Sequence, residues 1–400
     1  MPAPAPKYSI PIFSNSHGCI ITCLHISKEH IVTASDTGAI AAHAIDTGEL
    51  LHSFEGHRGG VWSLAVSGNT IVSGSTDKTA RVWDIDTGKC NHVFGGHTGT
   101  VRSLVLLKPQ WVKLGDDNGV VTKEKWPKRS LIVTGSRDAS LHVWTLPRPS
   151  EPLYDCFEGF SQEEIKNGTV NVSENPYHRE YLKGHRSSVR CVAGRGRTVI
   201  SASFDNELRV WDVITGECKW VLAGHSQKVY NVVYDHEREQ AFSGSMDGNI
   251  RLWDLNSGEC KRVMTGHTSL IGLLSLTPSY LVSGAADGTV RIWDRATGEW
   301  RDSHITPDLA VVRCFGCDDA KVVSGTSQVT MWNLKDSTVT DIPMSEDDIY
   351  QIKMLGKWCV VGVQVQKGVK LLVWDFSGNP EWVVGDVDEV EEVISDDEAL

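Results

Sequence analysis

A dipeptide pattern that recurs about every 40 residues constrains the fold of this chain more than any other feature. Gly-His pairs stand at 56–57, 96–97, 184–185, 224–225 and 266–267. Trp-Asp pairs stand at 83–84, 211–212, 253–254, 293–294 and 374–375. A period of about 40–45 residues that starts with Gly-His and ends with Trp-Asp is typical of the four-stranded blades of a β-propeller. The repeat therefore predicts an all-β protein.

The spacing of the tryptophans predicts how many blades the chain holds. From Trp211 to Trp374 they are 42, 40, 39 and 42 residues apart, counting Trp332 of a degenerate Trp-Asn pair. Eight units of this size fit the chain, although those at roughly 306–340 and 345–384 lack Gly-His and the one at roughly 14–54 lacks its Trp. We therefore predict one eight-bladed propeller of four-stranded antiparallel blades.

The domain boundaries follow from this count. The propeller is expected to span residues 14–384, after an N-terminal extension at 1–13 and before an acidic, disordered tail at 385–400. Two stretches exceed the repeat, at 108–129 and 147–179. Because they interrupt the first-to-second and third-to-fourth strand connections, both are expected on the bottom face, opposite the Gly-His loops.

Histidine, aspartate and tryptophan recur at fixed offsets in each good repeat, with serines nearby. The sets are His57, Asp77 and Trp83; His185, Asp205 and Trp211; His225, Asp247 and Trp253; and His267, Asp287 and Trp293. A Ser/His/Asp set invites a hydrolase hypothesis. One chain does not need several identical catalytic centres, so we interpret these residues as a hydrogen-bonded structural network and predict no enzyme activity.

A ring of residues at the mouth of the central channel is the candidate functional site. The fifth residue after each Gly-His histidine, or its equivalent, stands at the start of an innermost strand: Ile21, Trp62, Arg102, Arg190, Tyr230, Gly272, Arg313 and Tyr350. Arg137, in a turn that returns to the same face, joins Arg102 and Arg190 there. Three guanidinium groups near one point repel one another unless an anion lies between them, which predicts a phosphate, sulfate or carboxylate ligand. The alternative is that each arginine pairs with a local acid, such as Asp138 beside Arg137.

Charge, termini and cysteines exclude several classes of function. The formal net charge is −12, and eight of the acids lie between Asp386 and Glu398, so no basic surplus points to nucleic acid. We see no signal peptide and no apolar run long enough to span a membrane. The lone Cys-x-x-Cys of Cys314 and Cys317 has no second pair at zinc spacing, so we predict no metal and no cofactor. The chain is expected in the nucleus or the cytoplasm.

The stretches "GHTGTVRSL", "VTGSRDASLHVW", "GHRSSVRCV" and "KLLVWDF" resemble the substrate-receptor propellers of F-box/WD-repeat proteins in SCF ubiquitin ligases. The resemblance runs from about Ile20 to Phe376. It implies that Arg102, Arg137 and Arg190 hold the phosphothreonine of a degron, with phosphorylated Thr-Pro-type proteins as partners.

The same resemblance implies roles for neighbouring positions. Arg137 and Thr100 would face a second phosphate, and Trp62 and Thr76 would form an apolar pocket before the phosphothreonine. The remaining rim positions that it implies are Lys78, Lys228, Tyr230, Phe204, which stands where the family has a tyrosine, and Tyr350, which stands where the family has a tryptophan.

The F-box itself, a helical segment that docks a Skp-type adaptor, lies before the propeller in that family, and we find no helical pattern of that size here. A ligase role with adaptor and cullin therefore requires a missing N-terminal part. Alternatively, the chain binds phosphoproteins without delivering them. A third reading is a general WD-repeat scaffold that needs no phosphate.

Overall fold

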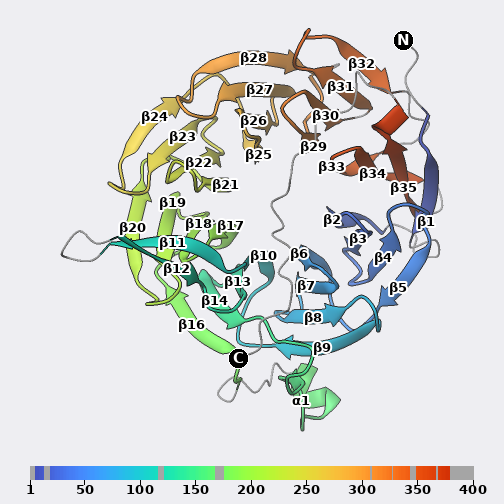
Figure 1. Ribbon diagram of the computed structural model, residues 1–400, viewed down its shortest axis with the longest axis vertical. Helices are drawn as coiled ribbons and strands as arrows, with labels where there is room; N and C mark the ends of the chain where they lie inside the picture. Colours follow the sequence, from blue (N-terminus) through green and yellow to red (C-terminus); the bar gives the residue numbers. More distant parts are fainter. Residues whose placement is uncertain are drawn as a thin grey trace.

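The computed structural model describes residues 5–12, 19–115, 121–166, 175–306, 309–326, 328–342, 348–365 and 368–378. Within these ranges, eight antiparallel sheets surround a central axis, which confirms the predicted eight-bladed propeller (Figure 1). Each blade is numbered below in chain order, and its strands are given from the innermost outward.

Blades 1 to 4 consist of β2 (Ile21–Ile26), β3 (His30–Ser35), β4 (Ile40–Ala44) and β5 (Leu50–Phe54); β6 (Val61–Ser67), β7 (Thr70–Ser75), β8 (Ala80–Asp84) and β9 (Lys89–Phe94); β10 (Val101–Leu107), β13 (Leu131–Ser136), β14 (Ser140–Thr145) and β16 (His178–Lys183); and β17 (Val189–Arg195), β18 (Thr198–Ser203), β19 (Glu207–Asp212) and β20 (Cys218–Ala223).

Blades 5 to 8 consist of β21 (Val229–Asp235), β22 (Gln240–Ser245), β23 (Ile250–Asp254) and β24 (Cys260–Met264); β25 (Ile271–Leu276), β26 (Tyr280–Ala285), β27 (Thr289–Asp294) and β28 (Trp300–Ile305); β29 (Cys314–Cys317), β30 (Lys321–Gly325), β31 (Val329–Asn333) and β32 (Val339–Ile342); and β33 (Ile349–Leu355), β34 (Trp358–Val365), β35 (Gly368–Asp375) and β1 (Tyr8–Ile12).

Strand β1 corrects the predicted N-terminal extension at 1–13. Residues Tyr8–Ile12 pair antiparallel with β35 and supply the outermost strand of blade 8, and the side chains of Ile10 and Ile12 are buried. The first and last parts of the chain therefore close the ring together and cover the edge that β35 would otherwise expose. Pairing between such distant segments leaves no mark in a local repeat pattern.

The two insertions connect the first strand to the second and the third strand to the fourth within blade 3. Residues 108–129 contain a hairpin of β11 (Gln110–Gly115) and β12 (Val121–Trp126) between β10 and β13. Residues 147–179 connect β14 to β16 and contain α1 (Gln162–Lys166) and β15 (Tyr154–Asp155). Because β15 pairs parallel with β9, blade 2 has five strands rather than the predicted four. A 3-10 helix, Phe376–Gly378, follows β35, and the predicted tail at 385–400 lies outside the described residues.

The core lies between consecutive blades. Val32 and Ala34 of blade 1 pack in one cluster with Ile71 and Trp83 of blade 2, and similar clusters join the following pairs of sheets. Each sheet is therefore covered on both faces, as its runs of β-branched residues require. No helix in the described part of the chain is long and apolar enough to cross a bilayer.

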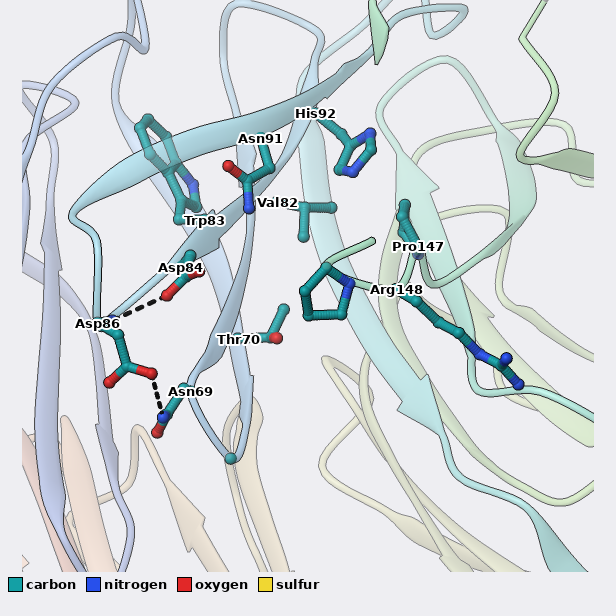
Figure 2. A pocket seen from close by; sticks show the side chains of 12 residues that line it. Asn69, Thr70, Val82, Trp83, Asp84, Asp86, Asn91, His92, Pro147 and Arg148 are labelled. Atoms are coloured by element: carbon teal, nitrogen blue, oxygen red, sulfur yellow. Dashed lines mark hydrogen bonds between the residues drawn. The ribbon is translucent and has the colours of Figure 1, made fainter. Parts of the chain in front are cut away.

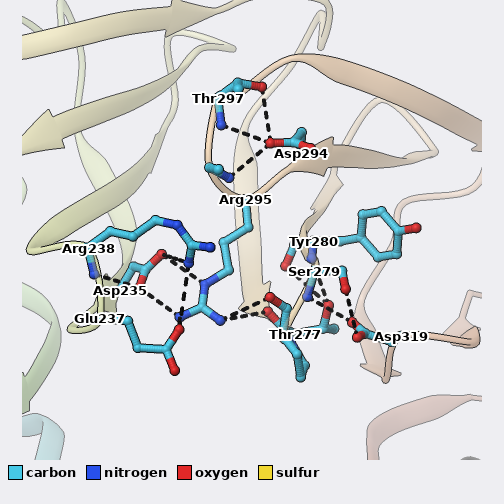
Figure 3. Close-up of polar contacts among 12 residues, drawn as sticks. Asp235, Glu237, Arg238, Thr277, Ser279, Tyr280, Asp294, Arg295, Thr297 and Asp319 are labelled. Carbon is cyan, nitrogen blue, oxygen red and sulfur yellow. Dashed lines mark hydrogen bonds and ion pairs between the residues drawn. The ribbon is translucent and has the colours of Figure 1, made fainter.

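A buried ion pair also joins blades 5 and 6 on the bottom side (Figure 3). The Arg295 guanidinium donates from Nε to Asp235 Oδ2 at 2.8 Å and from Nη2 to Oδ1 at 2.7 Å. Its Nη1 donates to the carbonyl oxygens of Thr277 and Pro278. The Asp235 side chain is fully buried, so the pair fixes one blade against the next without an unpaired charge.

Candidate functional site

The repeated His, Asp and Trp residues form hydrogen-bonded networks centred on a serine hydroxyl. In blade 2, His57 Nδ1 lies 2.8 Å from Asp77 Oδ2 and His57 Nε2 lies 2.7 Å from Ser73 Oγ, while Trp83 Nε1 donates to the same Ser73 oxygen at 2.8 Å. The same contacts recur in His185, Asp205, Ser201 and Trp211; in His225, Asp247, Ser243 and Trp253; and in His267, Asp287, Ser283 and Trp293.

These networks are structural rather than catalytic. The imidazole of His57 is fully buried, both of its nitrogens are occupied, and burial lowers its pKa. Burial alone would raise the pKa of Asp77, but hydrogen bonds from His57, Thr79 and the Arg58 backbone N–H hold it below its usual value. The Ser73 hydroxyl accepts from the Trp83 indole and hydrogen-bonds to the buried His57 imidazole, so it is not available to a substrate.

Blade 3 contains a fifth network that the sequence analysis missed. His97 pairs with Asp138 at 2.9 Å and with Thr134 Oγ1 at 2.9 Å, and Trp144 Nε1 donates to the same threonine oxygen. The insertion at 108–129 separates His97 from Asp138 by 41 residues instead of 20, and threonine replaces serine. Aligning the Asp with Trp144, rather than with His97, would have found it.

A β-bulge at the start of the innermost strand explains why the fifth position after the Gly-His histidine holds cationic and aromatic residues. The register shifts between Val61 and Ser63, between Val101 and Ser103, and at the same place in most other blades. The residue inside the bulge leaves the strand ladder, so its side chain need not enter the core. Arg102, Trp62, Arg190, Tyr230 and Tyr350 occupy this position. In blade 1 the bulge residue is Thr22, whereas the predicted ring residue Ile21 is buried.

The three predicted arginines line one pocket at the channel mouth. Its volume is about 780 Å³, and its walls come from blades 3 to 5: Arg102, Arg137, Asp138, Ala139, Arg186, Ser187, Ser188, Arg190, Phe204 and Tyr230. Arg102 and Arg190 stand at the starts of β10 and β17, and Arg137 stands in the turn after β13. Arginines 35 and 88 positions after Arg102 are thus brought together with it by the radial arrangement of the blades.

The electrostatics of this pocket reflect the closeness of the three cations. Burial, followed by repulsion from Arg190 and Arg137, lowers the pKa of Arg102 to about 10. Among the described residues, no ion pair joins any of the three guanidinium groups to an acid. The proposed local partner, Asp138, is already engaged by His97, the Thr98 N–H and Ser140. The pocket therefore presents unneutralised positive charge.

Other arginines on the same face do have local partners. Arg313, which occupies the equivalent ring position in blade 7, forms an ion pair with Asp348. Arg186, a pocket residue that the sequence analysis did not select, lies 2.7 Å from Glu207. The sequence feature that could have identified Arg186 as a pocket residue is its position directly after the Gly-His pair of blade 4. Arg102, Arg137 and Arg190, in contrast, have no acidic partner among the described residues, and they are called the arginine trio below.

Aromatic side chains border the trio. The Arg102 guanidinium carbon lies 4.2 Å from the centroid of the Trp62 ring. On the other side, the rings of Phe204 and Tyr230 lie 5.0 Å apart, and Lys228 Nζ lies 5.1 Å from the Phe204 ring. These contacts surround the cations with flat apolar surfaces and one further ammonium group.

Six predicted residues lie outside the walls of this pocket: Trp62 and Lys228, whose ring contacts are given above, and Thr76, Lys78, Thr100 and Tyr350. Thr76 is exposed and its hydroxyl donates to the Gly60 carbonyl, while Lys78 is exposed in the turn of blade 2 with a φ of 70°. The Thr100 carbonyl accepts from the Arg137 N–H at 2.9 Å. Tyr350, in blade 8, hydrogen-bonds to Gln364 and packs against a core cluster.

The structure contains no assembled metal-ligand set in the ranges it describes. No group of three or more His, Cys, Asp or Glu side chains there could hold an ion. All ten cysteines are free, and burial raises the pKa of Cys314 and of Cys317 to about 12. Such thiols are poor nucleophiles at neutral pH.

Comparison with known proteins identifies the repeat. The family model described as "WD domain, G-beta repeat" matches residues 48–84, 176–212, 216–254 and 258–294. The structure of the computationally designed Ika8 protein superposes with a TM-score of 0.69 at 24% identity, covering 92% of this chain and 98% of that one. That likeness concerns the fold alone.

Two relatives of this chain share one name. Cell division control protein 4 of Candida albicans is 41% identical over 351 residues, which is 86% of this chain and 49% of the relative. Cell division control protein 4 of Saccharomyces cerevisiae is 37% identical over 388 residues, which is 90% of this chain and 46% of the relative. The chain thus spans about half the length of these relatives. It is an eight-bladed β-propeller in which four segments match the WD40 repeat, and over most of its length it is similar to cell division control protein 4.

Proposed function

We propose that this propeller binds phosphorylated protein segments, of the Thr-Pro type, at the pocket of Arg102, Arg137 and Arg190. The observation that carries the proposal is that these three guanidinium groups share a pocket and have no acidic partner among the described residues. A phosphate carries about −1.5 to −2 charges and three acceptor oxygens, so it neutralises such a cluster better than a carboxylate.

The residues around the trio would contact the rest of the segment. Trp62 and Thr76 would cover an apolar residue before the phosphothreonine, and Arg137 with Thr100 would face a second phosphate. The rim would be completed by Lys78, Phe204, Lys228, Tyr230 and Tyr350. Phe204 supplies an aromatic wall but no hydroxyl donor, so phosphate binding would rest on the guanidinium groups.

We propose further that the propeller acts as the substrate-recognition part of an SCF-type ubiquitin ligase, in the nucleus or the cytoplasm. Similarity to cell division control protein 4 over most of the chain supports this role. Contact with a Skp-type adaptor and a cullin would need sequence outside the half that this chain spans.

The test compares matched phosphorylated and unphosphorylated Thr-Pro peptides by fluorescence anisotropy, with the wild type, Arg137→Ala and Arg313→Ala. Since a charge-assisted hydrogen bond contributes about 1.5–3 kcal/mol, Arg137→Ala should weaken phosphopeptide binding about 10- to 150-fold. Arg313→Ala is the matched control, because its arginine is already paired with Asp348. Binding should also weaken steeply with salt.

Equal affinity of the wild type for both peptides would refute phosphate recognition and leave the scaffold reading. The ligase role needs a separate test, which is a pull-down of a Skp-type adaptor with this chain and with any longer product of the same gene. We expect this chain alone not to retain the adaptor. Failure of the longer product to retain it would refute the ligase role without affecting the phosphopeptide site.

A further inference from the structure

The aspartate of each Trp-Asp pair has two separate tasks, one for each carboxylate oxygen. In blade 5, Asp254 Oδ1 accepts the N–H of Asn256 at 2.8 Å and so stabilises the turn before the outermost strand. Asp84, Asp212 and Asp294 accept the equivalent N–H with the same oxygen. The other oxygen, Oδ2, is left for a different partner.

In four of these blades that partner is a cation of the same chain. Asp254 Oδ2 lies 2.7 Å from Lys261 Nζ, and Asp294 Oδ2 lies 2.7 Å from Arg301 Nη2. Asp212 Oδ2 accepts from Arg197 Nε at 2.8 Å, and Asp375 Oδ2 lies 3.1 Å from Lys7 Nζ. Each of these four carboxylates is thereby neutralised internally.

Blade 2 departs from this arrangement. Asp84 Oδ2 has no hydrogen bond or ion pair with the described residues, although Oδ1 accepts from Asp86 and Thr87 as expected. The position seven residues after the aspartate, which holds Lys261 in blade 5 and Arg301 in blade 6, is Asn91 here. The internal cation is thus replaced by a neutral amide.

A pocket opens beside this unneutralised carboxylate (Figure 2). Its volume is about 400 Å³, and the two bottom turns of blade 2 and the start of the second insertion line it: Gly68, Asn69, Thr70, Val82, Trp83, Asp84, Asp86, Asn91, His92, Pro147, Arg148 and Pro149. Asp86 brings a second carboxylate, whose Oδ2 accepts from Asn69 Nδ2 at 2.6 Å. Arg148 lies at the rim with its guanidinium pointing away from both aspartates.

His92 provides an independent sign that the pocket takes a ligand. Its side chain lines the pocket and the residue is only 3% exposed, yet its Nδ1 has no hydrogen-bond partner among the residues that the structure describes. Burial lowers the pKa of this histidine to about 4, so the ring is neutral at physiological pH. A buried polar atom without a partner costs about 1–3 kcal/mol, which a bound donor or acceptor would offset.

We propose that this pocket binds the arginine side chain of a partner protein, on the face opposite the phosphopeptide site. The carboxylates of Asp84 and Asp86, two residues apart at the end of β8, offer acceptor oxygens for the planar fork of a guanidinium group, which makes two parallel hydrogen bonds. The prolines at 147 and 149 supply flat apolar walls, and guanidinium is more weakly hydrated than ammonium, so it enters such a site at lower cost. The partner's arginine takes the place that Lys261 and Arg301 fill internally.

The experiment is saturation-transfer NMR on the full chain with Nα-acetyl-arginine amide. The lysine and citrulline amides are matched probes, because citrulline keeps the shape of arginine without its charge. We expect saturable binding of the arginine probe with a Kd of about 10 mM or below, and binding of the other two that is several-fold weaker. No saturable signal, or equal signals from arginine and citrulline, would overturn the proposal. An equal signal from lysine would overturn the assignment to guanidinium.

Three variants locate the site. Asp86→Asn should lose at least several-fold in affinity, and Asn91→Lys should abolish binding because the new ammonium pairs with Asp84 as Lys261 pairs with Asp254. Asp294→Asn removes the same charge elsewhere on the bottom face and should bind like the wild type. If Asn91→Lys does not fold, the comparison of Asp86→Asn with Asp294→Asn tests the site. Equal losses of affinity for the arginine probe in these two variants would refute the pocket as the site. None of these variants changes Arg102, Arg137 or Arg190, so the outcome of the phosphopeptide test is independent of the outcome here.

Discussion

The guanidinium of Arg102 in blade 3 stacks on the ring of Trp62 in blade 2, with 4.2 Å between the guanidinium carbon and the ring centroid. The contact crosses from one blade to the next and holds Arg102 at the pocket where Arg137 and Arg190 also lie. An aromatic face stabilises a desolvated cation by about 0.5–2 kcal/mol. It offsets part of the repulsion that the trio creates without neutralising the charge.

Replacing Arg102 by glutamine should therefore stabilise the free protein while weakening phosphopeptide binding. The lowered pKa of Arg102 shows that its charged form is disfavoured by burial and by the other two arginines. After allowance for solvent screening of a half-buried group, we expect a gain of about 1 kcal/mol in the free energy of unfolding. Urea titration measures it.

Inorganic phosphate should have unequal effects on the stability of the wild type and of Arg102→Gln. A ligand that binds only the folded state raises the unfolding midpoint, so phosphate should stabilise the wild type more than Arg102→Gln. Arg313→Gln, which breaks an internal ion pair, is the control and should gain no stability. A loss of stability in Arg102→Gln would show that the trio is internally compensated.

Removing one partner of the buried Arg295 and Asp235 pair should strongly destabilise the propeller. Asp235→Ala leaves the buried Arg295 guanidinium with only the exposed Glu237 as an acidic partner, which costs about 3–5 kcal/mol, whereas the double change Asp235→Leu with Arg295→Met should cost much less. Equilibrium denaturation of the three proteins checks this. A double variant as unstable as Asp235→Ala would mean that the pair does more than satisfy its own charges.

The same pair contributes to acid sensitivity. Burial alone would raise the pKa of Asp235, but hydrogen bonding and charge from Arg295 hold it below its usual value. A carboxylate whose folded pKa is lowered stabilises the protein above its unfolded pKa of about 3.9, and this contribution is lost as the pH falls below that value. Unfolding free energies should decrease below pH 4 more steeply in the wild type than in the double variant.

His43 should make the protein less stable between pH 6.5 and pH 4. It stands in the Trp position of blade 1, it is 2% exposed, and burial lowers its pKa to about 4. Because the unfolded chain takes up a proton near pH 6.5 and the folded chain does not, stability falls as the pH drops through this window. At pH 5 the contribution is about 2 kcal/mol. Urea titrations at pH 7 and pH 5 should show a smaller drop for His43→Leu, and an equal drop would contradict this.

The closing strand β1 should be needed for full stability. Ile10 and Ile12 are buried against blade 8, whereas Ser9, directly before Ile10, is exposed. Ile12→Ala should cost about 2–5 kcal/mol and Ser9→Ala within about 0.5 kcal/mol, because only the former leaves a cavity. Thermal unfolding compares the two variants. Equal midpoints would show that β1 adds nothing to closure.

The repeat alone predicted the fold class, the number of blades and the positions of Arg102, Arg137 and Arg190 on one face. A period that encodes one supersecondary unit can be read locally, since each blade carries its own turns, network and inner strand. The positions of the two insertions followed from strand direction for the same reason. Where an insertion broke the spacing, as between His97 and Asp138, the local pattern failed.

Only the tertiary structure decided which charges are neutralised and how the ring closes. Arg313 meets Asp348, and Asp84 lacks the cation that Asp254 has in Lys261, because these contacts depend on side-chain placement rather than on residue type. Likewise, β1 joins β35, β15 joins β9, and the bulge in blade 1 selects Thr22 over Ile21. Such pairings connect residues far apart in the chain or differ by a single position of register. The hydrophobic period of the sequence predicts neither the distant pairings nor the register, because it indicates which residues are buried but not which residues they contact.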